Sequence, residues 1–292
     1  MKTASNKLNL EPEADAERDH EFEFTDADFE RIRELVYRHA GISLSDAKRN
    51  LVYSRLARRL RRLNLVSFTA YTDYLEEHLD AELTEFLNSI TTNLTSFFRE
   101  NHHFETLRNQ VLPELMAGNG RRRIRIWSAG CSTGEEPYSI AMTVKETLPE
   151  NSGCDVKILA TDLDTNVLQK ARDGIYDAER VQQLPQARVH RWMRRGSGAN
   201  AGQVRVNADL QSMIQFNQLN LMESWPMRGP FDVVFCRNVV IYFDKDTQRR
   251  LFERFADLMA PDAYLFVGHS ETLYKVTDRF ELQGQTVYRK KY

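Results

Sequence analysis

The chain has 292 residues and a formal net charge of −2, a length that allows one large domain or two smaller ones. The near-neutral charge argues against binding nucleic acid over the whole surface. Three cysteines without a CxxC pair argue against a disulfide framework or zinc cluster, and with no visible signal peptide and no stretch of ~18 apolar residues we expect a cytoplasmic protein.

The first half of the sequence predicts helices only. Residues 1–24 are polar and acidic and are expected to form a disordered leader. Thr25 with Asp28 has the signature of a helix N-cap, and Gly41 is expected to end that helix. Together with further predicted helices, this defines a helical domain at 25–116, followed by a glycine-containing linker at 117–122. The further helices are expected at 46–63, 68–78, 82–93 and 102–116.

From residue 123 to 292, strand-like runs alternate with helices. This order predicts an α/β domain with a doubly wound, Rossmann-like parallel sheet that is covered on both faces. An insertion at about 177–211 interrupts the order, and its loop GSGANAG, flanked by apolar alternation, predicts a small antiparallel β-subdomain. The predicted strands lie at 124–128, 156–161, 214–220, 231–236 and 264–268, and the helices at 136–147, 165–172 and 245–259.

The segment 128–142 (SAGCSTGEEPYSIAM) joins the first predicted strand to a helix. Gly130 and Gly134 allow a sharp turn without side chains that block a ligand. Their GxxxG spacing is not the GxGxxG dinucleotide fingerprint. Glu135 and Glu136 would repel a pyrophosphate and tolerate a ligand with positive charge and hydroxyls, such as S-adenosylmethionine. The alternative is an ordinary turn that needs small residues.

Two further polar segments follow predicted strands, at the sheet edge where open α/β sheets bind ligands. In TDLD (161–164), Asp162 is suited to accept hydrogen bonds from both ribose hydroxyls, and helix capping by Asp164 is the alternative. In LNL (219–221), the Asn220 side chain and the Leu221 N–H are suited to read adenine. An asparagine at a strand end is more often a turn residue.

The segment FCRNVVIYFD (235–244) follows the fourth predicted strand. Arg237, Asn238 and Tyr242 should therefore lie where the reacting group binds, although an ordinary core aromatic is the alternative for Tyr242. The Asn/Asp-Pro-Pro-aromatic signature of methylases that act on base amino groups is absent here.

The segment TTNLTSFFRE (91–100) lies between the helical part and the sheet domain. Its polar residues Asn93, Thr95 and Arg99 are expected to cover the ligand cleft, while the neighbouring phenylalanines anchor the segment. The alternative is a helix C-terminus with a cationic neighbour.

A basic stripe is predicted on the helix at 46–63. Arg55, Arg58, Arg59 and Arg62 recur at i, i+3, i+4 and i+7 and so share one face. A solvated helix face is the simplest explanation, and an acidic partner, either RNA phosphate or an acidic protein helix, is the other. The adjacent pair at 102–103 (HH) has no further ligand at metal spacing, so no metal is predicted.

Taken together, these segments resemble the CheR family, the S-adenosylmethionine-dependent methyltransferases of bacterial chemotaxis receptors. The resemblance covers nearly the whole chain from about residue 25. It implies a class I methyltransferase sheet, an N-terminal helical domain and a small β-subdomain, and glutamate side chains of receptor cytoplasmic helices as substrate. It rests on TTNLTSFFRE, WSAGCSTGEEPYSIA, TDLDTNVLQKARDGIY, FDVVFCRNVVIYFD and VGHSETL.

The resemblance also assigns roles to residues. It implies that Tyr242 lies near the transferred methyl group. Arg99 and Arg237 are expected to orient cofactor and substrate, which makes Arg99 the second catalytic candidate. The arginine stripe would meet acidic receptor helices, and the GSGANAG loop is of the type that binds a short peptide at the receptor C-terminus. The implied cofactor residues, beside the turn at Gly130, are Asn93, Thr95, Arg99, Glu136, Asp162, Asn220, Leu221, Arg237 and Asn238. An RNA methyltransferase and a non-catalytic module that senses S-adenosylmethionine or S-adenosylhomocysteine are the alternatives.

Overall fold

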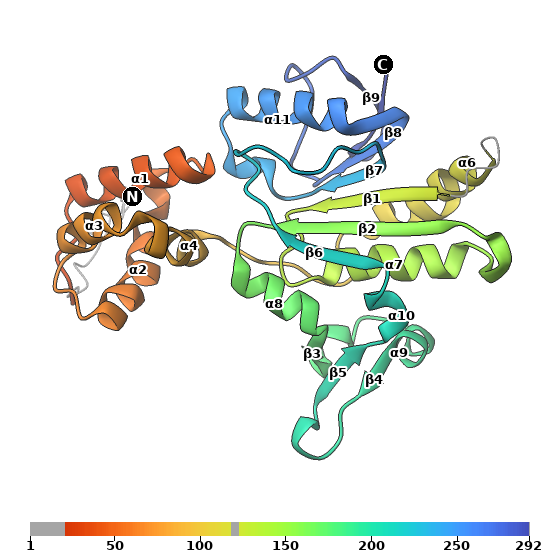
Figure 1. Ribbon diagram of the computed structural model, residues 1–292, viewed down its shortest axis with the longest axis horizontal. Coiled ribbons are helices and arrows are strands. Elements are labelled where there is room, and N and C mark those ends of the chain that lie inside the picture. Colours follow the sequence, from red (N-terminus) through yellow and green to blue (C-terminus); the bar gives the residue numbers. More distant parts are fainter. Residues whose placement is uncertain (1–20, 118–122, 292) are drawn as a thin grey trace, which may run out of the picture.

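The computed structural model describes residues 21–117 and 123–291. Its first part is a group of helices around a separate apolar core (Figure 1). The first helix begins with a capping box in which Thr25 and Asp28 bond each other's backbone N–H, and it ends at Gly41 with φ 68°, as predicted. The helices are α1 (Asp26–Ala40), α2 (Arg49–Leu63), α3 (Phe68–Glu77) and α4 (Leu79–Ile90), with a short 3-10 turn η1 (Asp46–Lys48) before α2.

The predicted leader ends in ordered structure. Its residues 1–20 lie outside the described residues, as do 118–122 of the predicted linker. Phe22 is buried and its N–H donates to the Tyr53 hydroxyl over 3.2 Å. Glu21 pairs with Arg61 at 2.5 Å. The packed helical part therefore begins before the predicted boundary at residue 25.

A hinge segment, residues 91–96, connects α4 to the rest of the chain. The helix was predicted to run from 82 to 93, but it ends at Ile90, and Thr91 has an extended ψ of 144°. The Thr91 hydroxyl and the Asn93 amide both donate to Asp164, at 2.9 and 2.7 Å. These bonds to the sheet domain hold the hinge segment away from the helical path.

The second part is a mixed seven-stranded sheet in the order β6-β2-β1-β7-β8-β10-β9. The five predicted strands are present and pair in parallel. The antiparallel strands β9 and β10 at the C-terminal edge were not predicted. The bounds are β1 (Arg123–Ala129), β2 (Asp155–Asp162), β6 (Ile214–Gln218), β7 (Phe231–Cys236), β8 (Met259–Val267), β9 (Phe280–Gly284) and β10 (Val287–Lys290).

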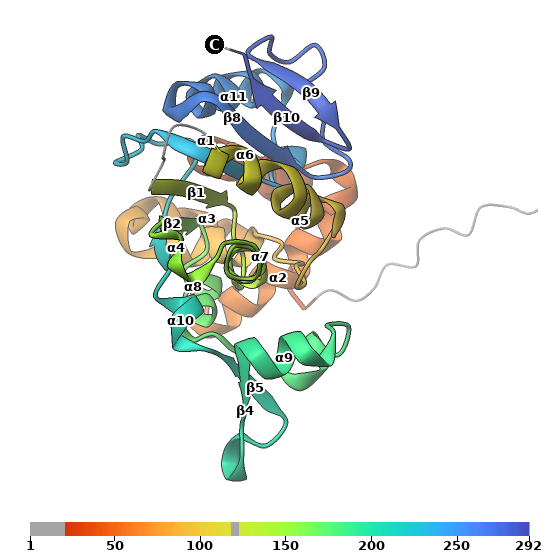
Figure 2. The same cartoon turned by 90° about the vertical axis from the view of Figure 1, so that its right-hand side faces the viewer.

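Both faces of the sheet are buried. Along β1, Ile126 belongs to the apolar cluster on one face and Trp127 to the cluster on the other, because successive strand residues point to opposite sides. Figure 2 shows α11 on one face and α5, α6 and α7 on the other. The covering helices are α5 (His102–Thr106), which continues through a π turn η2 (Leu107–Val111) into α6 (Leu112–Ala117), then α7 (Glu135–Thr147), α8 (Thr165–Asp173) and α11 (Lys245–Leu258).

The predicted β-subdomain is present as a three-stranded antiparallel sheet in the order β3-β5-β4. It projects from the main sheet beside α8 (Figure 1) and begins slightly earlier than residue 177, because Ile175 already pairs with Arg205. Its strands are β3 (Ile175–Asp177), β4 (Met193–Arg195) and β5 (Gln203–Val206), with the short helices α9 (Gln186–Trp192) and α10 (Ala208–Gln211).

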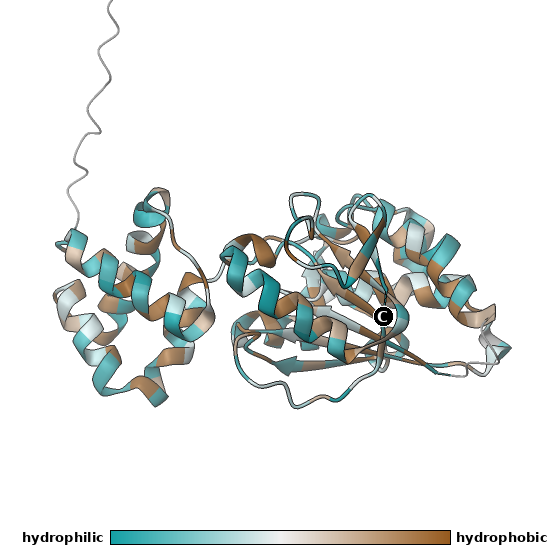
Figure 3. Ribbon diagram, turned by 90° about the horizontal axis from the view of Figure 1, so that it is seen from above, coloured by the Kyte–Doolittle hydropathy of each residue, from teal (hydrophilic) through white to brown (hydrophobic). Residues whose placement is uncertain are grey.

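The helical part lies beside one end of the sheet, joined through the hinge segment (Figure 3). Asn88 of α4 donates to the Thr165 hydroxyl over 2.9 Å, and Tyr37 of α1 donates to Asp244 over 2.6 Å. Among the described residues, no helix has the length and apolar character needed to span a membrane.

Candidate functional site

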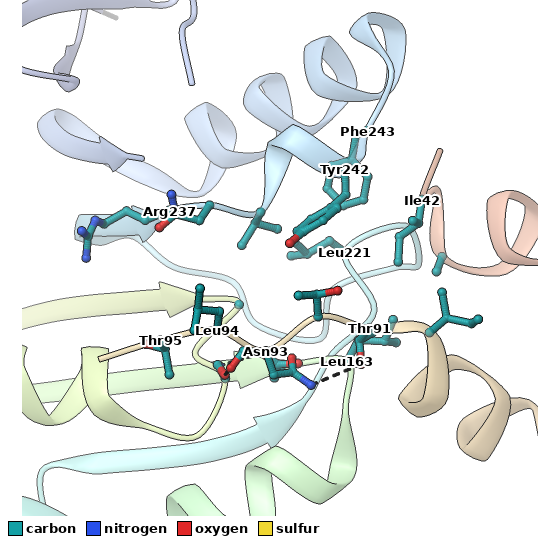
Figure 4. Close-up of a pocket in the computed structure, with 18 of the residues that line it drawn as sticks. Ile42, Thr91, Asn93, Leu94, Thr95, Leu163, Leu221, Arg237, Tyr242 and Phe243 are labelled. Atoms are coloured by element: carbon teal, nitrogen blue, oxygen red, sulfur yellow. Dashed lines mark hydrogen bonds between the residues drawn. The ribbon is translucent and has the colours of Figure 1, made fainter. Parts of the chain in front are cut away.

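A cavity opens at the junction of the helical part and the sheet, beyond the carboxyl ends of β1, β2 and β7 (Figure 4). It encloses about 1270 Å³ of empty space, including its open mouth. The helical part contributes a mostly apolar wall from the segment at 40–51. All of the predicted cofactor residues and Tyr242 line this cavity: Asn93, Thr95, Arg99, Gly130, Glu136, Asp162, Asn220, Leu221, Arg237 and Asn238.

The glycine turn closes one side of the cavity. Gly130 has φ 85°, and its N–H donates to the Thr161 carbonyl over 2.8 Å, which joins the ends of β1 and β2. A Cβ at Gly130 would lie 2.3 Å from Cγ2 of Val239. Glycine is therefore required here for its backbone angle and for the close approach of the chain after β7. The sharp turn and the space left for a ligand were predicted from the sequence, and the contact with Val239 was not.

Asp162 is buried beneath the turn. Its Oδ2 accepts the Ser132 N–H over 2.7 Å, and its Oδ1 accepts the Asp164 N–H over 3.0 Å. Burial raises the pKa of Asp162 to about 6 despite these bonds. Each carboxylate oxygen has a second acceptor position, so the group is suited to a ligand hydroxyl. Asp164 fulfils the capping alternative as well, because its Oδ1 accepts from the first N–H groups of α8.

Arg237 connects two glutamates at the wall of the cavity. Its guanidinium donates to Glu136 Oε2 over 2.9 Å and lies 3.2 Å from Glu100 Oε2. Burial raises the pKa of Glu136, in opposition to the Arg237 charge and the Ser128 hydrogen bond. Burial would also raise the pKa of Glu100, but the His269 hydrogen bond and the Arg237 charge outweigh it and lower that pKa to about 2. The cavity wall thus combines carboxylates with one buried cation.

Two predicted ligand-reading side chains are engaged with the protein itself. Asn220 donates to the His39 carbonyl over 2.6 Å, and its Oδ1 accepts the Met222 N–H over 3.0 Å. Its Oδ1 keeps a second acceptor position and Asn220 lines the cavity, so the reading of adenine by this amide stays a prediction. The Asn93 amide likewise donates to Asp164 and fastens the hinge segment.

Arg99 and Tyr242 lie at the accessible part of the cavity. Arg99 is half-buried and donates one N–H to the Leu94 carbonyl over 2.8 Å. The ring of Tyr242 is half-buried too and projects across the cavity toward the hinge segment (Figure 4). Its carbonyl accepts the Ser43 N–H over 2.8 Å, which ties the segment after β7 to the helical part. The core-aromatic alternative for Tyr242 does not describe this placement.

Two residues that hold the site were not assigned a role from the sequence. Ser128, at the end of β1, donates to Glu136 Oε1 over 2.7 Å. Glu271 is buried and accepts several backbone N–H groups from the segment after β7. Both lie within segments quoted for the family resemblance, but a serine or a glutamate in a motif gives no sign of its partner when the partner is distant in sequence.

The predicted arginine stripe is divided in the structure. Arg58 and Arg62 are exposed, whereas Arg55 and Arg59 have internal partners. Arg55 donates to the Thr91 carbonyl over 2.9 Å at the start of the hinge segment. Arg59 makes a two-pronged pair with the buried Glu82. The face is split because Arg55 and Arg59 turn toward the neighbouring α4, whereas Arg58 and Arg62 are exposed. Arg62 lies at the edge of α4, 3.8 Å from Glu85.

One group among the described residues brings three possible metal-ligating atoms within 4.8 Å of one another: Glu100, His102 and His103. Arg237 already lies 3.2 Å from the Glu100 carboxylate. A cation at this place would face that guanidinium at short range, which disfavours its binding.

Nearly the whole chain is similar to known proteins. A family model described as the SAM binding domain of CheR methyltransferase matches residues 93–289, and one described as its all-alpha domain matches residues 27–91. "Chemotaxis protein methyltransferase 2" of Pseudomonas aeruginosa is 48% identical over 92% of this chain and 94% of its own. "Chemotaxis protein methyltransferase" of Escherichia coli is 48% identical over 90% and 91%. The protein of that name from Borreliella burgdorferi is 40% identical over 94% of each.

Proposed function

The chain belongs to the CheR methyltransferase family, and we propose that it transfers the methyl group of S-adenosylmethionine to glutamate carboxylates of chemotaxis receptors, forming methyl esters. The observation that carries the proposal is the convergence of residues from five separate segments on one cavity. The relatives that match over nine-tenths of the chain are named as chemotaxis methyltransferases. We also propose that the protein acts in the cytoplasm, on the cytoplasmic part of these receptors.

The cavity residues suit this cofactor. The buried carboxylates of Asp162 and Glu136 favour hydroxyl and ammonium groups and disfavour phosphate. Nε of Arg237 is buried without a hydrogen-bond partner, so it is available to the carboxylate of the amino-acid part. When bound, the cofactor supplies an electrophilic methyl group on a sulfonium sulfur. Leu221 and the apolar wall would then enclose the adenine.

The substrate carboxylate needs no general base. A glutamate side chain has a pKa of about 4.3 and is already ionised at neutral pH. Its oxygen forms a bond to the methyl carbon as the carbon–sulfur bond breaks, and the electron pair of that bond stays on sulfur. The protein contributes alignment and water exclusion. Holding the reacting atoms about 3–3.5 Å apart can remove several kcal/mol from the barrier.

Arg99 and Tyr242 are proposed to align the incoming carboxylate. Both line the cavity where it is accessible, and Arg99 still has N–H groups beyond the one given to Leu94. A bidentate grip would orient the carboxylate, but a strong one would also reduce its nucleophilicity. The Tyr242 hydroxyl, if it lies beside the methyl group, would restrict the approach of the substrate carboxylate to one direction.

Receptor docking is proposed to use the exposed arginines of α2 and, in addition, the β-subdomain. Arg58 and Arg62 point to solvent and would attract acidic methylation helices over a range of about one Debye length, ~8–10 Å. The loop at 196–202, between β4 and β5, is the proposed site for a short peptide from the receptor C-terminus.

The test uses full-length protein, methyl-labelled S-adenosylmethionine and receptor-containing membranes. Wild-type protein should label the receptor, and alkali should release the label as methanol, because carboxyl methyl esters hydrolyse and N-methyl products do not. Asp162→Asn should lose most of the label. Asp246→Asn, an exposed carboxylate on α11, should behave as wild type. Label in RNA, or cofactor binding with no transfer to receptor, would refute the proposal in favour of an RNA methyltransferase or a sensor.

A further inference from the structure

A buried carboxylate lies behind the cavity, in the turn that follows β8. Glu271 is only 4% exposed and accepts four backbone N–H groups. Its Oε2 accepts from Gly268 over 2.5 Å and from Asn238 over 2.9 Å. Its Oε1 accepts from Val239 over 2.9 Å and from Ile241 over 3.2 Å. The side chain therefore ties together the chain segments that leave two adjacent strands, β7 and β8.

Three of these four donors belong to one segment, residues 237–242, which we call the β7 exit loop. The loop has an unusual backbone, with Asn238 at φ 58° in the left-handed region. For a residue other than glycine, this conformation persists only when its surroundings enforce it. The consecutive N–H groups of Asn238 and Val239 converge on one carboxylate, so Glu271 supplies that enforcement.

The β7 exit loop carries much of the cavity wall. Arg237, Asn238, Val239 and Tyr242 all line the cavity. Val239 lies so close to Gly130 that a Cβ there would be 2.3 Å from it, so the loop also fixes the glycine turn. Glu271 itself is not among the cavity-lining residues.

A buried carboxylate at residue 271 is better explained by a role in positioning the β7 exit loop than by a contribution to core stability. Burying a carboxylate is costly, and burial raises the pKa of Glu271 although the backbone N–H bonds act to lower it. An apolar residue would fill the same space without that cost. Only a group with two oxygens can accept four N–H groups from two loops at once.

We propose that Glu271 is a positioning residue for methyl transfer, which acts through the β7 exit loop to hold Asn238 and Tyr242 in their places at the cavity. This inference rests on the proposed function, since it relies on the alignment role given above to Tyr242. It predicts that loosening the loop lowers the rate of transfer more than it lowers cofactor affinity.

The neighbouring Gly268 offers a second perturbation of the same loop. A Cβ at Gly268 would lie 2.4 Å from Nδ2 of Asn238, 2.9 Å from its backbone N and 2.9 Å from Oε2 of Glu271. Gly268→Ala would displace the loop without altering the Glu271 charge. If the position of the loop determines the rate, Glu271→Gln and Gly268→Ala should change the amide exchange of the loop, the cofactor affinity and kcat in the same way.

The matched control is Glu146→Gln. Glu146 lies in the same domain, is 15% exposed and accepts from Arg108, Arg188 and Trp192. It does not line the cavity. Its loss should cost stability in the same way as the loss of Glu271 and leave the β7 exit loop in place.

The experiment compares the three variants with wild type in full-length protein at a temperature where all are folded by circular dichroism. Amide exchange of residues 237–242 is read by mass spectrometry, affinity for S-adenosylhomocysteine by calorimetry, and kcat with receptor membranes. In Glu271→Gln and Gly268→Ala we expect faster exchange of the loop. We also expect a fall in kcat about tenfold or more beyond any loss of affinity. Glu146→Gln should show neither.

Wild-type kcat and loop exchange in a folded Glu271→Gln or Gly268→Ala protein would overturn the inference. Loss of activity in all three variants in proportion to their melting temperatures would also overturn it, in favour of a purely structural role. If wild-type protein binds S-adenosylhomocysteine but methylates no receptor, the proposed function fails. Unchanged exchange of the loop with normal receptor methylation refutes the role of Glu271 alone.

Discussion

Arg237 at the end of β7 donates to Glu136 in the first turn of α7 over 2.9 Å, and only 2% and 11% of the two side chains are exposed. This pair joins the segments that follow the adjacent parallel strands β1 and β7. Arg237 also donates to the Arg99 carbonyl. One guanidinium thus organises three segments, which requires its planar fork of N–H groups.

Arg237→Lys should therefore impair cofactor binding although the charge is kept. A lysine ammonium cannot reach Glu136, Glu100 and the Arg99 carbonyl at once. We expect affinity for S-adenosylhomocysteine to fall by about tenfold or more, which corresponds to about 1.4 kcal/mol. Calorimetric titration measures this. Arg249→Lys, in an exposed pair on α11, should leave the affinity unchanged, and equal affinity in both variants would contradict the assignment.

Cofactor affinity should depend on pH through Asp162. Its pKa in the folded protein is raised from 3.8 to about 6 by burial. If the ionised carboxylate accepts the ribose hydroxyls, affinity should rise about tenfold from pH 5 to pH 7.5. Asp162→Asn should bind weakly and flatten that part of the profile. A remaining rise in the variant would assign the titration to Glu136, whose pKa burial also raises.

The same shift has a consequence for stability in the absence of ligand. A carboxyl with a raised pKa in the folded state stabilises the fold at low pH and loses that contribution as pH rises through its folded pKa. The Asp162 contribution to the free energy of unfolding should therefore decrease between about pH 4 and pH 6. Urea titrations of wild type and Asp162→Asn over this range test the sign. A difference that grows in favour of wild type with rising pH would contradict it.

Tyr242→Phe and Arg99→Ala should lower turnover with the fold intact. Both side chains line the accessible part of the cavity, and misplacing the attacking oxygen by about 1 Å can cost about 100-fold in rate. We expect kcat to fall about 10- to 100-fold and melting temperatures to change little. Rates are measured at saturating receptor. Wild-type rates in both variants would remove these residues from the mechanism.

The divided arginine stripe predicts two different phenotypes. Charge reversal at the exposed Arg58 and Arg62 should weaken receptor methylation most at low salt, while affinity for S-adenosylhomocysteine stays the same. Arg59→Ala should instead lower stability by about 3–5 kcal/mol, because Glu82 would stay buried without its partner. Thermal unfolding measures the stability defect, and methylation rates at several salt concentrations measure the docking defect. A salt-independent defect in the Arg58 and Arg62 variant would oppose the steering role.

Much of the fold followed from periodicity in the sequence. Runs such as 231–236 are apolar on both faces, a pattern that is typical of buried parallel strands. Thr25 and Gly41 correctly predicted the two ends of the first helix. The strands β9 and β10 were missed because residues 280–290 alternate weakly and carry several exposed polar side chains. The end of α4 was misplaced because its position depends on bonds from Thr91 and Asn93 to Asp164, more than 70 residues away.

The cavity residues were found from the sequence because strand ends carry ligands in this fold class. The hydrogen-bond partners of the individual residues could not be predicted from the sequence. Asn220 was expected to read adenine, and nothing in the sequence indicated that it also holds the His39 carbonyl of α1. Arg55 was expected at the surface and instead holds the hinge segment. Such long-range pairs depend on how the helical part meets the sheet, and local patterning carries no information about that.

The most direct measurement is a crystal structure of the protein with S-adenosylhomocysteine. We expect the ligand in the cavity beyond β1, β2 and β7, with the Asp162 carboxylate within hydrogen-bond distance of both ribose hydroxyls and the sulfur facing Tyr242. A ligand bound elsewhere, or a cavity that stays empty at saturating concentration, would contradict it.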